Sequence, residues 1–322
     1  MLKALLLVAA ALAAAVCSPA SWAQGYPNRP VKLLVGFPPG GSTDLAARLL
    51  AARLSQALGQ TFVVENRAGA SGNIAAQEVA RAAPDGYTLM MAATSFAAAP
   101  AFFDNLPWDP VKDFAPVALV ATVPILVVAT PTLKVGSMKE LVDHSKANPT
   151  KINLASPGAT TLTRLSGEQF KKTAKLDWVT VHYKGGAPAM KDLLAGFAHV
   201  MFSNISDVIA QVNAGKLTPL AVTTPARSAV LPNVPTLAEA GYPEASFSTW
   251  QGVVGPAGMP REVVDRLNAE IRKIMAAPEI KAQFLTMGTD AVAGTPEEFG
   301  ILVKDEVAKI KRVAVAVGAT NN

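Results

Sequence analysis

Residues 31–44 read Val31-Lys32-Leu33-Leu34-Val35-Gly36-Phe37-Pro38-Pro39-Gly40-Gly41-Ser42-Thr43-Asp44, an apolar run followed by a glycine- and proline-rich segment. The run over 31–37 predicts a buried strand, because it is short and almost entirely apolar. The pattern over 45–58 predicts a helix that is capped by Asp44 and stopped by Gly59. The stretch therefore begins one strand-loop-helix unit.

The same alternation of strand and helix continues along the chain. Residues 61–65 and 87–92 predict two further strands, with a helix over 73–83 between them. Strands that alternate with helices in this way favour a parallel sheet. Four more strands predict a second sheet, and they lie over 151–155, 178–183, 200–204 and 217–223.

Capping boxes mark two helix starts, because a hydroxyl residue and an acidic residue three positions later can cap each other's amides. Ser137 with Glu140 predicts a helix that runs to about 146, and Thr236 with Glu239 predicts another that stops at Gly241. The remaining elements are a strand over 250–254 and amphipathic helices over 261–275 and 296–315.

Residues 114–130 form one apolar stretch broken by Pro124, too long for an ordinary strand and without a helical pattern. We interpret it as a strand that crosses between domains. The length of 322 residues also favours two domains, since single cores stop growing at roughly 250–300 residues. We expect an α/β fold with one lobe over 24–122 and 250–322 and the other over 123–249.

The composition is that of a packed globular protein. Apolar residues make up 50% of the chain and charged residues 16%, which excludes a mostly disordered chain. The formal charge of +5 comes from 29 Lys and Arg against 24 Asp and Glu, without a basic block. A nucleic-acid surface is therefore not indicated, and a mild preference for anions is the simpler interpretation.

The first residues have the pattern of an export signal. Lys3 precedes an apolar run over 4–16, and small residues at Ser21 and Ala23 occupy the positions that a signal peptidase reads. The run is shorter than the roughly 20 residues that span a bilayer. We expect cleavage after Ala23 and an exported chain; the alternative is that Cys17 is a lipid-attachment site.

The glycine pair at Gly40 and Gly41 is the strongest candidate for a binding loop. Without side chains there, an anion can approach the amides at the start of the next helix, and Ser42 and Thr43 add hydroxyl donors. The alternative is an ordinary tight turn. A second loop of this type follows a strand at 156–161, whereas the glycines of 69–73 are interpreted as backbone geometry.

Motifs for catalysis are missing from the sequence. The three histidines, His144, His182 and His199, lack the spacing of a zinc site, and no Gly-x-Ser-x-Gly elbow occurs. Asp207 either caps a helix through Gln211 or reaches a cleft, where it would accept a hydrogen bond from a ligand hydroxyl or amine. We expect no enzymatic activity, no cofactor and no metal.

Several segments, in order along the whole mature chain, resemble the Bug-type solute-binding proteins of tripartite tricarboxylate transporters. The segments are 26–31, 37–44, 64–73, 84–89, 183–186, 214–217, 234–241 and 255–258. The resemblance implies a monomeric two-lobed periplasmic binding protein of type II-like fold. Each lobe would be a mixed, mostly parallel sheet flanked by helices, with a hinge of crossing strands.

The resemblance also implies a function and a site. Such a receptor closes on a small carboxylate and delivers it to a membrane permease. Backbone amides and waters in two loops hold the carboxylate, and the departure at Arg164, where relatives have His, could place a cation near the cleft. The expected ligand-binding residues are Phe37, Gly40, Gly41, Ser42, Thr43, Thr94, Ser95, Ser156, Gly158, Thr160, Thr161, Asn204 and Asp207.

Two questions stay open at the level of the sequence. Phe37, Phe96 and Trp250 form apolar walls of the cleft, or at least one of them packs in the core. The receptor serves transport, or it presents its ligand to a signalling partner; a secreted hydrolase or isomerase with an unrecognised site is the third reading.

Overall fold

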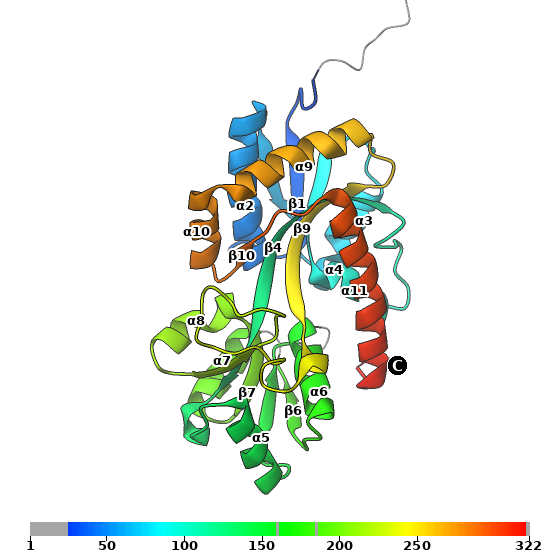
Figure 1. The fold of residues 1–322 in the computed structure, drawn as a ribbon. Coiled ribbons are helices and arrows are strands. Elements are labelled where there is room, and N and C mark those ends of the chain that lie inside the picture. Colours follow the sequence, from blue (N-terminus) through cyan, green and yellow to red (C-terminus); the bar gives the residue numbers. More distant parts are fainter. Residues whose placement is uncertain (1–24, 159–160, 184–185, 320–322) are drawn as a thin grey trace, which may run out of the picture.

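The computed structural model describes residues 25–158, 161–183 and 186–319, and it shows two lobes joined by two long strands (Figure 1). The first lobe contains β1 (Val31–Val35), β2 (Phe62–Asn66), β3 (Thr88–Ala93) and the short β10 (Asp290–Ala291). The second contains β5 (Asn153–Ser156), β6 (Val179–His182), β7 (Val200–Asn204) and β8 (Thr218–Val222). The expected two-lobed α/β fold is confirmed.

The joining strands are β4 (Phe114–Ala129) and β9 (Ser248–Pro256), which pair with each other in antiparallel fashion. β4 pairs with β9 as far as Pro124, and from Ile125 onward it pairs with β7 and β8. The change of partner therefore falls at the proline, which has no N–H to donate to a ladder. The apolar stretch over 114–130 is the crossing strand that its length indicated.

The strand order is β2-β1-β3-β9-β4-β7-β5-β6, with β8 and β10 also on β4. Parallel pairs occur in β2-β1-β3 and in β7-β5-β6, while every pair that involves β4 or β9 is antiparallel. The sheets are mixed as expected, but less parallel than expected, because the crossing strands enter against the direction of their neighbours.

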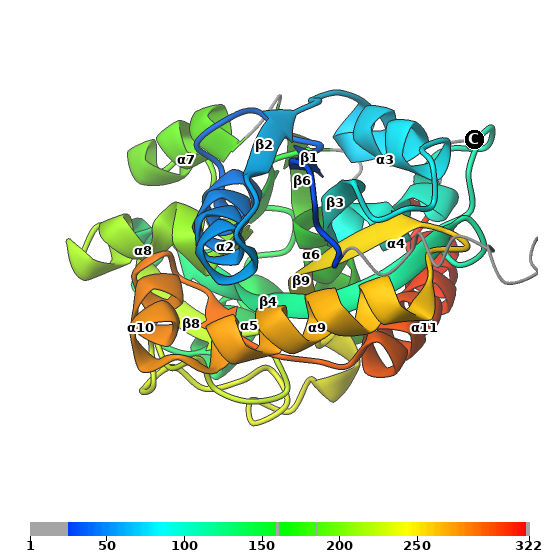
Figure 2. The same ribbon diagram turned by 90° about the horizontal axis from the view of Figure 1, so that it is seen from above.

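Helices cover both faces of the first lobe's sheet (Figure 2). Val31, Leu33 and Val35 of β1 pack against α2 (Ser42–Leu58), α9 (Arg261–Ala276) and α10 (Pro278–Thr286). Leu34 points to the opposite face, whose core also contains side chains of α3 (Asn73–Ala80), α4 (Thr94–Phe102) and α11 (Pro296–Ala316). This alternation along β1 is that of a strand buried on both faces.

In the second lobe, α5 (Met138–Ala147) and α6 (Leu162–Thr173) cover one face, and α7 (Gly186–Ala195) and α8 (Ile205–Asn213) the other. Single 3₁₀ turns lie at Ala70–Gly72, Pro131–Leu133 and Pro243–Ala245. Within the described ranges, every helix is too short or too polar to cross a bilayer.

Two helix predictions need correction. Helix α2 begins at Ser42 with Gly41 as its N-cap, so Asp44 lies inside the first turn and is not the cap. The capping box of Thr236 and Glu239 forms both of its hydrogen bonds, yet only a turn follows. Gly241 is left-handed at φ +92°, which ends the segment before a helix can develop.

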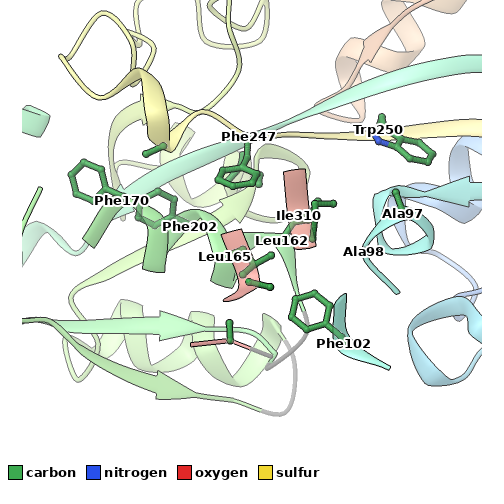
Figure 3. Close-up of a cluster of buried hydrophobic side chains, with 14 of the residues drawn as sticks. Ala97, Ala98, Phe102, Leu162, Leu165, Phe170, Phe202, Phe247, Trp250 and Ile310 are labelled. Atoms are coloured by element: carbon green, nitrogen blue, oxygen red, sulfur yellow. The ribbon is translucent and has the colours of Figure 1, made fainter. Parts of the chain in front are cut away.

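One hydrophobic core runs through both lobes beside the crossing strands (Figure 3). Phe102 of α4 and Ile310 of α11 lie close to Leu162 and Leu165 of α6, and Phe247 lies just before β9. The C-terminal end of α11 is also tied to the second lobe, because the Lys172 ammonium donates to the Ala316 carbonyl at 2.8 Å. The lobes therefore share packed apolar surface as well as two strands.

Candidate functional site

A cavity of about 480 Å³ lies where the lobes meet. Its walls come from the segments that follow β1, β2, β3, β5, β6 and β7, from β7 itself and from the crossing strands. The lining residues are Phe37, Pro38, Pro39, Gly41, Ser42, Thr43, Ser71, Ala93, Thr94, Ser95, Ala98, Val123, Pro157, Thr161, Leu162, Thr163, Gly186, Met201, Ser203, Asn204, Asp207, Thr249, Trp250 and Gln251.

Four helix N-termini reach this cavity. Helices α2, α4, α6 and α8 begin at Ser42, Thr94, Leu162 and Ile205, and residues at or beside each start line the wall. Each of these helices is the next helix after a strand with a parallel partner, β1, β3, β5 or β7, so the wall is built at the carboxyl ends of parallel strands. The first N–H groups of a helix have no partner within it and carry partial positive charge. The arrangement favours a bound anion.

The two glycines of the first loop have different roles. Gly40 has φ +87°, which suits glycine, and its N–H donates to the Asp44 carboxylate at 2.9 Å. Gly41 is extended at φ −77° and faces the cavity, whereas Gly40 does not line it. Gly40 therefore shapes the loop and Gly41 leaves room beside it.

The buried carboxylate of Asp44 fixes the conformation of this loop through hydrogen bonds. It is only 1% exposed and accepts hydrogen bonds from the Gly40 amide, from Arg48 Nε at 2.9 Å and from Asn66 Nδ2 at 2.8 Å. Asn66 Nδ2 also donates to the Phe37 carbonyl. Burial by itself would raise the pKa of Asp44, but these hydrogen bonds outweigh it and hold the pKa below its usual value. Asp44 is thus a structural anion.

The second loop uses most of its hydroxyls internally. Ser156 is buried and donates to the Gly158 carbonyl at 3.1 Å, and Thr161 donates to the same carbonyl at 3.0 Å. Thr161 also caps α6 by accepting from the Arg164 amide. Thr161 lines the cavity, but Ser156, Gly158 and Arg164 do not. Thr160 lies outside the described residues.

The crossing strand β9 forms the floor of the cavity. The Trp250 amide donates to Thr94 Oγ1 at 2.6 Å, which ties the start of α4 to β9. The indole of Trp250 packs edge-to-face on Phe299, with centroids 5.2 Å apart. Phe96 stacks on Trp108 in the core, so it is not a wall, while Phe37 is half-buried and lines the cavity.

Asp207 is the single ionisable side chain among the described residues that line the cavity. It lies in the first turn of α8, and its carboxylate remains exposed on the cavity side. Desolvation by surrounding protein raises the pKa of Asp207, and hydrogen bonds from Ser206 and Asn204 offset this only in part. Of the two sequence interpretations, the structure favours the one in which Asp207 reaches the cleft.

Sequence reasoning missed several lining side chains. Gln251 is almost fully buried on β9; its Nε2 lies 3.4 Å from Ser42 Oγ, and its Oε1 has no hydrogen-bond partner among the described residues. Ser71 lies in the segment interpreted as backbone geometry, Thr163 lies just beyond the loop of 156–161, and Ser203 lies within the predicted strand of 200–204. No local signal marks these residues. No group of His, Cys, Asp and Glu suited to a metal ion occurs in the described part of the chain.

Comparison with known proteins identifies the family. Residues 46–319 match the model of the tripartite tricarboxylate transporter family receptor. Protein BugT of Bordetella pertussis is 35% identical over 308 residues, which cover 95% of this chain and 94% of that protein.

Solved structures agree with this match. Rpa4515 of R. palustris, solved with adipate, has a TM-score of 0.82 at 35% identity and covers 92% of this chain and 100% of its own. MatC of Rhodopseudomonas palustris, solved with malate, has a TM-score of 0.75 at 31% identity, with coverages of 89% and 99%. Proteins of this family are periplasmic binding receptors and not enzymes. The chain therefore belongs to the tripartite tricarboxylate transporter receptor family, as a Bug-type solute-binding protein.

Proposed function

We propose that this receptor captures a small carboxylate in the cavity between its lobes and delivers it to the permease of a tripartite transporter. The observation that carries the proposal is the convergence of four helix N-termini on a cavity without a basic side chain in its described wall. Amides and hydroxyls at those termini would hold the carboxylate. Two structural relatives hold adipate and malate, which supports this ligand class.

The crossing strands supply the hinge in this proposal. One lobe would comprise 24–122 and 250–322 and the other 123–249. Both boundaries fall at the same place in the β4–β9 ladder, where Thr122 pairs with Trp250 and Val123 with Thr249, just before β4 takes β7 and β8 as partners from Ile125 onward. At this crossing the Thr249 hydroxyl donates to the Val123 carbonyl at 2.7 Å. Small rotations of the backbone here would open or close the cavity. The mature receptor would begin at Gln24 and act as a monomer.

A thermal-shift screen followed by calorimetry tests the ligand class. The panel contains aliphatic and aromatic mono- and dicarboxylates, each paired with its neutral amide, for example adipate with adipamide. A ligand at about 100 times its Kd should stabilise the protein by roughly 2.7 kcal/mol. We expect acids to bind and their amides not to bind, and a panel in which no acid binds would refute the proposal.

Two further measurements test the receptor role. Solution scattering of the saturated protein should show a smaller radius of gyration than the free protein, because the lobes close on the ligand. Mass spectrometry should recover the bound compound unchanged after prolonged incubation. Consumption of the compound would favour the hydrolase or isomerase alternative.

A further inference from the structure

The cavity has an uneven distribution of charge. The loops of the first lobe present neutral donors, namely the amides and hydroxyls around Ser42, Thr94 and Ser95. The second lobe presents the N-termini of α6 and α8, neutral hydroxyls and one carboxylate, Asp207, which lies in the first turn of α8. No Lys, Arg or His is among the described lining residues, so the charge of Asp207 meets no cation in the wall.

An acidic residue in the first turn of a helix has an ordinary structural role, because it stabilises the positive end of the helix dipole. That role requires no place in a cavity wall. Asp207 nevertheless lines the cavity as an exposed residue, and the protein atoms around it raise its pKa. Its hydrogen bonds from Ser206, which is long at 3.4 Å, and from Asn204 use only part of the acceptor capacity of the two carboxylate oxygens. The carboxylate thus retains acceptor capacity toward the cavity.

This acceptor sets a condition on the ligand. If the carboxylate of a ligand binds at the helix N-termini of the first lobe, the far end of a small ligand approaches the second lobe. A second carboxylate there would meet the negative charge of Asp207, at a cost of about tenfold or more in affinity. An ammonium or hydroxyl group would instead donate a charge-assisted hydrogen bond.

We propose that Asp207 makes this receptor select monocarboxylates that carry a hydrogen-bond donor, an ammonium or a hydroxyl, at the end remote from the carboxylate. Dicarboxylates of the same length are disfavoured. This inference rests on the proposed function, since it assumes that a carboxylate binds in the cavity.

Two ligand series of matched length test it. One comprises 4-aminobutyrate, 4-hydroxybutyrate, butyrate and succinate, and the other 6-aminohexanoate, 6-hydroxyhexanoate, hexanoate and adipate. Calorimetry on the mature protein compares the parent with Asp207→Asn. Asp143→Asn serves as the matched control. Asp143 is an exposed residue of α5 paired with Lys139, so this substitution removes the same charge at a position away from the cavity.

In the parent, at least one donor-bearing acid should bind about tenfold or more tightly than the dicarboxylate of its series. Asp207→Asn should remove most of that preference, both by weakening the donor-bearing acid and by strengthening the dicarboxylate, and Asp143→Asn should preserve it. If Asp207→Asn lowers the affinity for the amino acids alone, the group that donates to Asp207 is an ammonium. If it lowers the affinity for the hydroxy acids alone, that group is a hydroxyl.

The outcomes separate this inference from the proposed function. If carboxylates bind and the ratio of donor-bearing acid to dicarboxylate is the same in parent and Asp207→Asn, the role of Asp207 is overturned while the receptor remains a carboxylate binder. A parent that prefers the dicarboxylate also overturns it. If no carboxylate of the series or of the wider panel binds, both proposals fail.

Discussion

Separate substitutions of the two glycines of the first loop, Gly40 and Gly41, should affect stability and ligand affinity independently. Gly41 has backbone angles of φ −77° and ψ 165°, a region that valine adopts readily. A Cβ added there would find the Pro38 carbonyl oxygen at 3.9 Å as its nearest neighbour, an ordinary contact. Because Gly41 lines the cavity, the branches of a valine would occupy space beside the amides that hold the ligand.

Gly41→Val should change the affinity far more than the stability. Gly41→Val loses a tolerable N-cap residue, a cost of up to about 1 kcal/mol. The stiffer unfolded chain offsets roughly 0.4–1 kcal/mol of it. The unfolding free energy should therefore change by less than about 1 kcal/mol. Blocking one hydrogen bond to a charged group costs about 1.5–3 kcal/mol of binding, or roughly 10- to 150-fold in Kd.

Gly40→Ala is the matched control. Gly40 has φ +87° and does not line the cavity, and an added Cβ there meets no atom within 4 Å. Its cost is backbone strain of about 1–2 kcal/mol, reduced by the smaller entropy of the unfolded chain. We expect Gly40→Ala to lower stability while leaving affinity within about threefold, because binding changes below about 0.6 kcal/mol reflect no lost contact.

Urea unfolding followed by circular dichroism gives the stability of both variants, and calorimetry with the tightest carboxylate of the panel gives the affinity. Gly41→Val should be as stable as the parent and bind weakly or not at all, and Gly40→Ala should show the reverse. A folded Gly41→Val protein that binds like the parent would refute the view that the loop cradles the carboxylate.

Three further predictions concern stability and processing. Asp44→Ala removes three hydrogen bonds to a buried carboxylate and should cost about 3 kcal/mol in urea unfolding, against less than about 1 kcal/mol for Asp143→Ala in its exposed ion pair. Because the pKa of Asp44 is lowered in the folded state, this contribution is present above the unfolded value of 3.8 and is lost as pH falls through the folded pKa, so parent and variant should converge in strong acid. Phe102→Ala empties part of the core shared by the lobes and should cost about 3–5 kcal/mol, measured by calorimetric unfolding; a cost below about 1 kcal/mol would contradict the packing described. Intact mass of the periplasmic protein should correspond to a chain that begins at Gln24, and a mass that retains Met1 or a lipid on Cys17 would reject cleavage after Ala23.

Local rules predicted the elements that local chemistry determines. The strand-loop-helix unit of 31–58 and its stop at Gly59 follow from hydrophobic pattern and from a residue with left-handed φ of 69°. The crossing strand follows from length alone, since 114–129 is too long for one sheet edge. Helix α4 escaped prediction because it is buried on most sides and therefore lacks an amphipathic stripe, and because Pro100 inside it is a residue that normally ends a helix.

The site residues also fall into those that the sequence predicts and those that depend on the folded geometry. Ser42 and Thr43 could be predicted, because residues at the start of a helix that follows a parallel strand reach the same edge of the sheet. Thr161 belongs to a second loop of the same type, whereas Thr94 follows only from the family resemblance. Gln251 and Ser203 lie on strands whose approach to the cavity depends on the crossing of the two lobes. Ser156 has the expected residue type, but its hydroxyl is used within its own loop, and only the folded geometry reveals this.

The cavity and the shared core have side chains in common, and this connects binding to the contact between the lobes. Ala98 of α4, Leu162 of α6 and Trp250 of β9 belong both to the cavity wall and to the hydrophobic core that runs through both lobes. A ligand in the cavity therefore approaches side chains that already hold the lobes together, and any shift of those side chains repacks a dense interior. We accordingly expect ligand binding and lobe closure to be coupled through apolar packing as well as through hydrogen bonds at the helix N-termini. Substitutions such as Leu162→Ala should weaken the affinity for every carboxylate alike, whereas substitutions at Asp207 should change the order in which carboxylates are preferred.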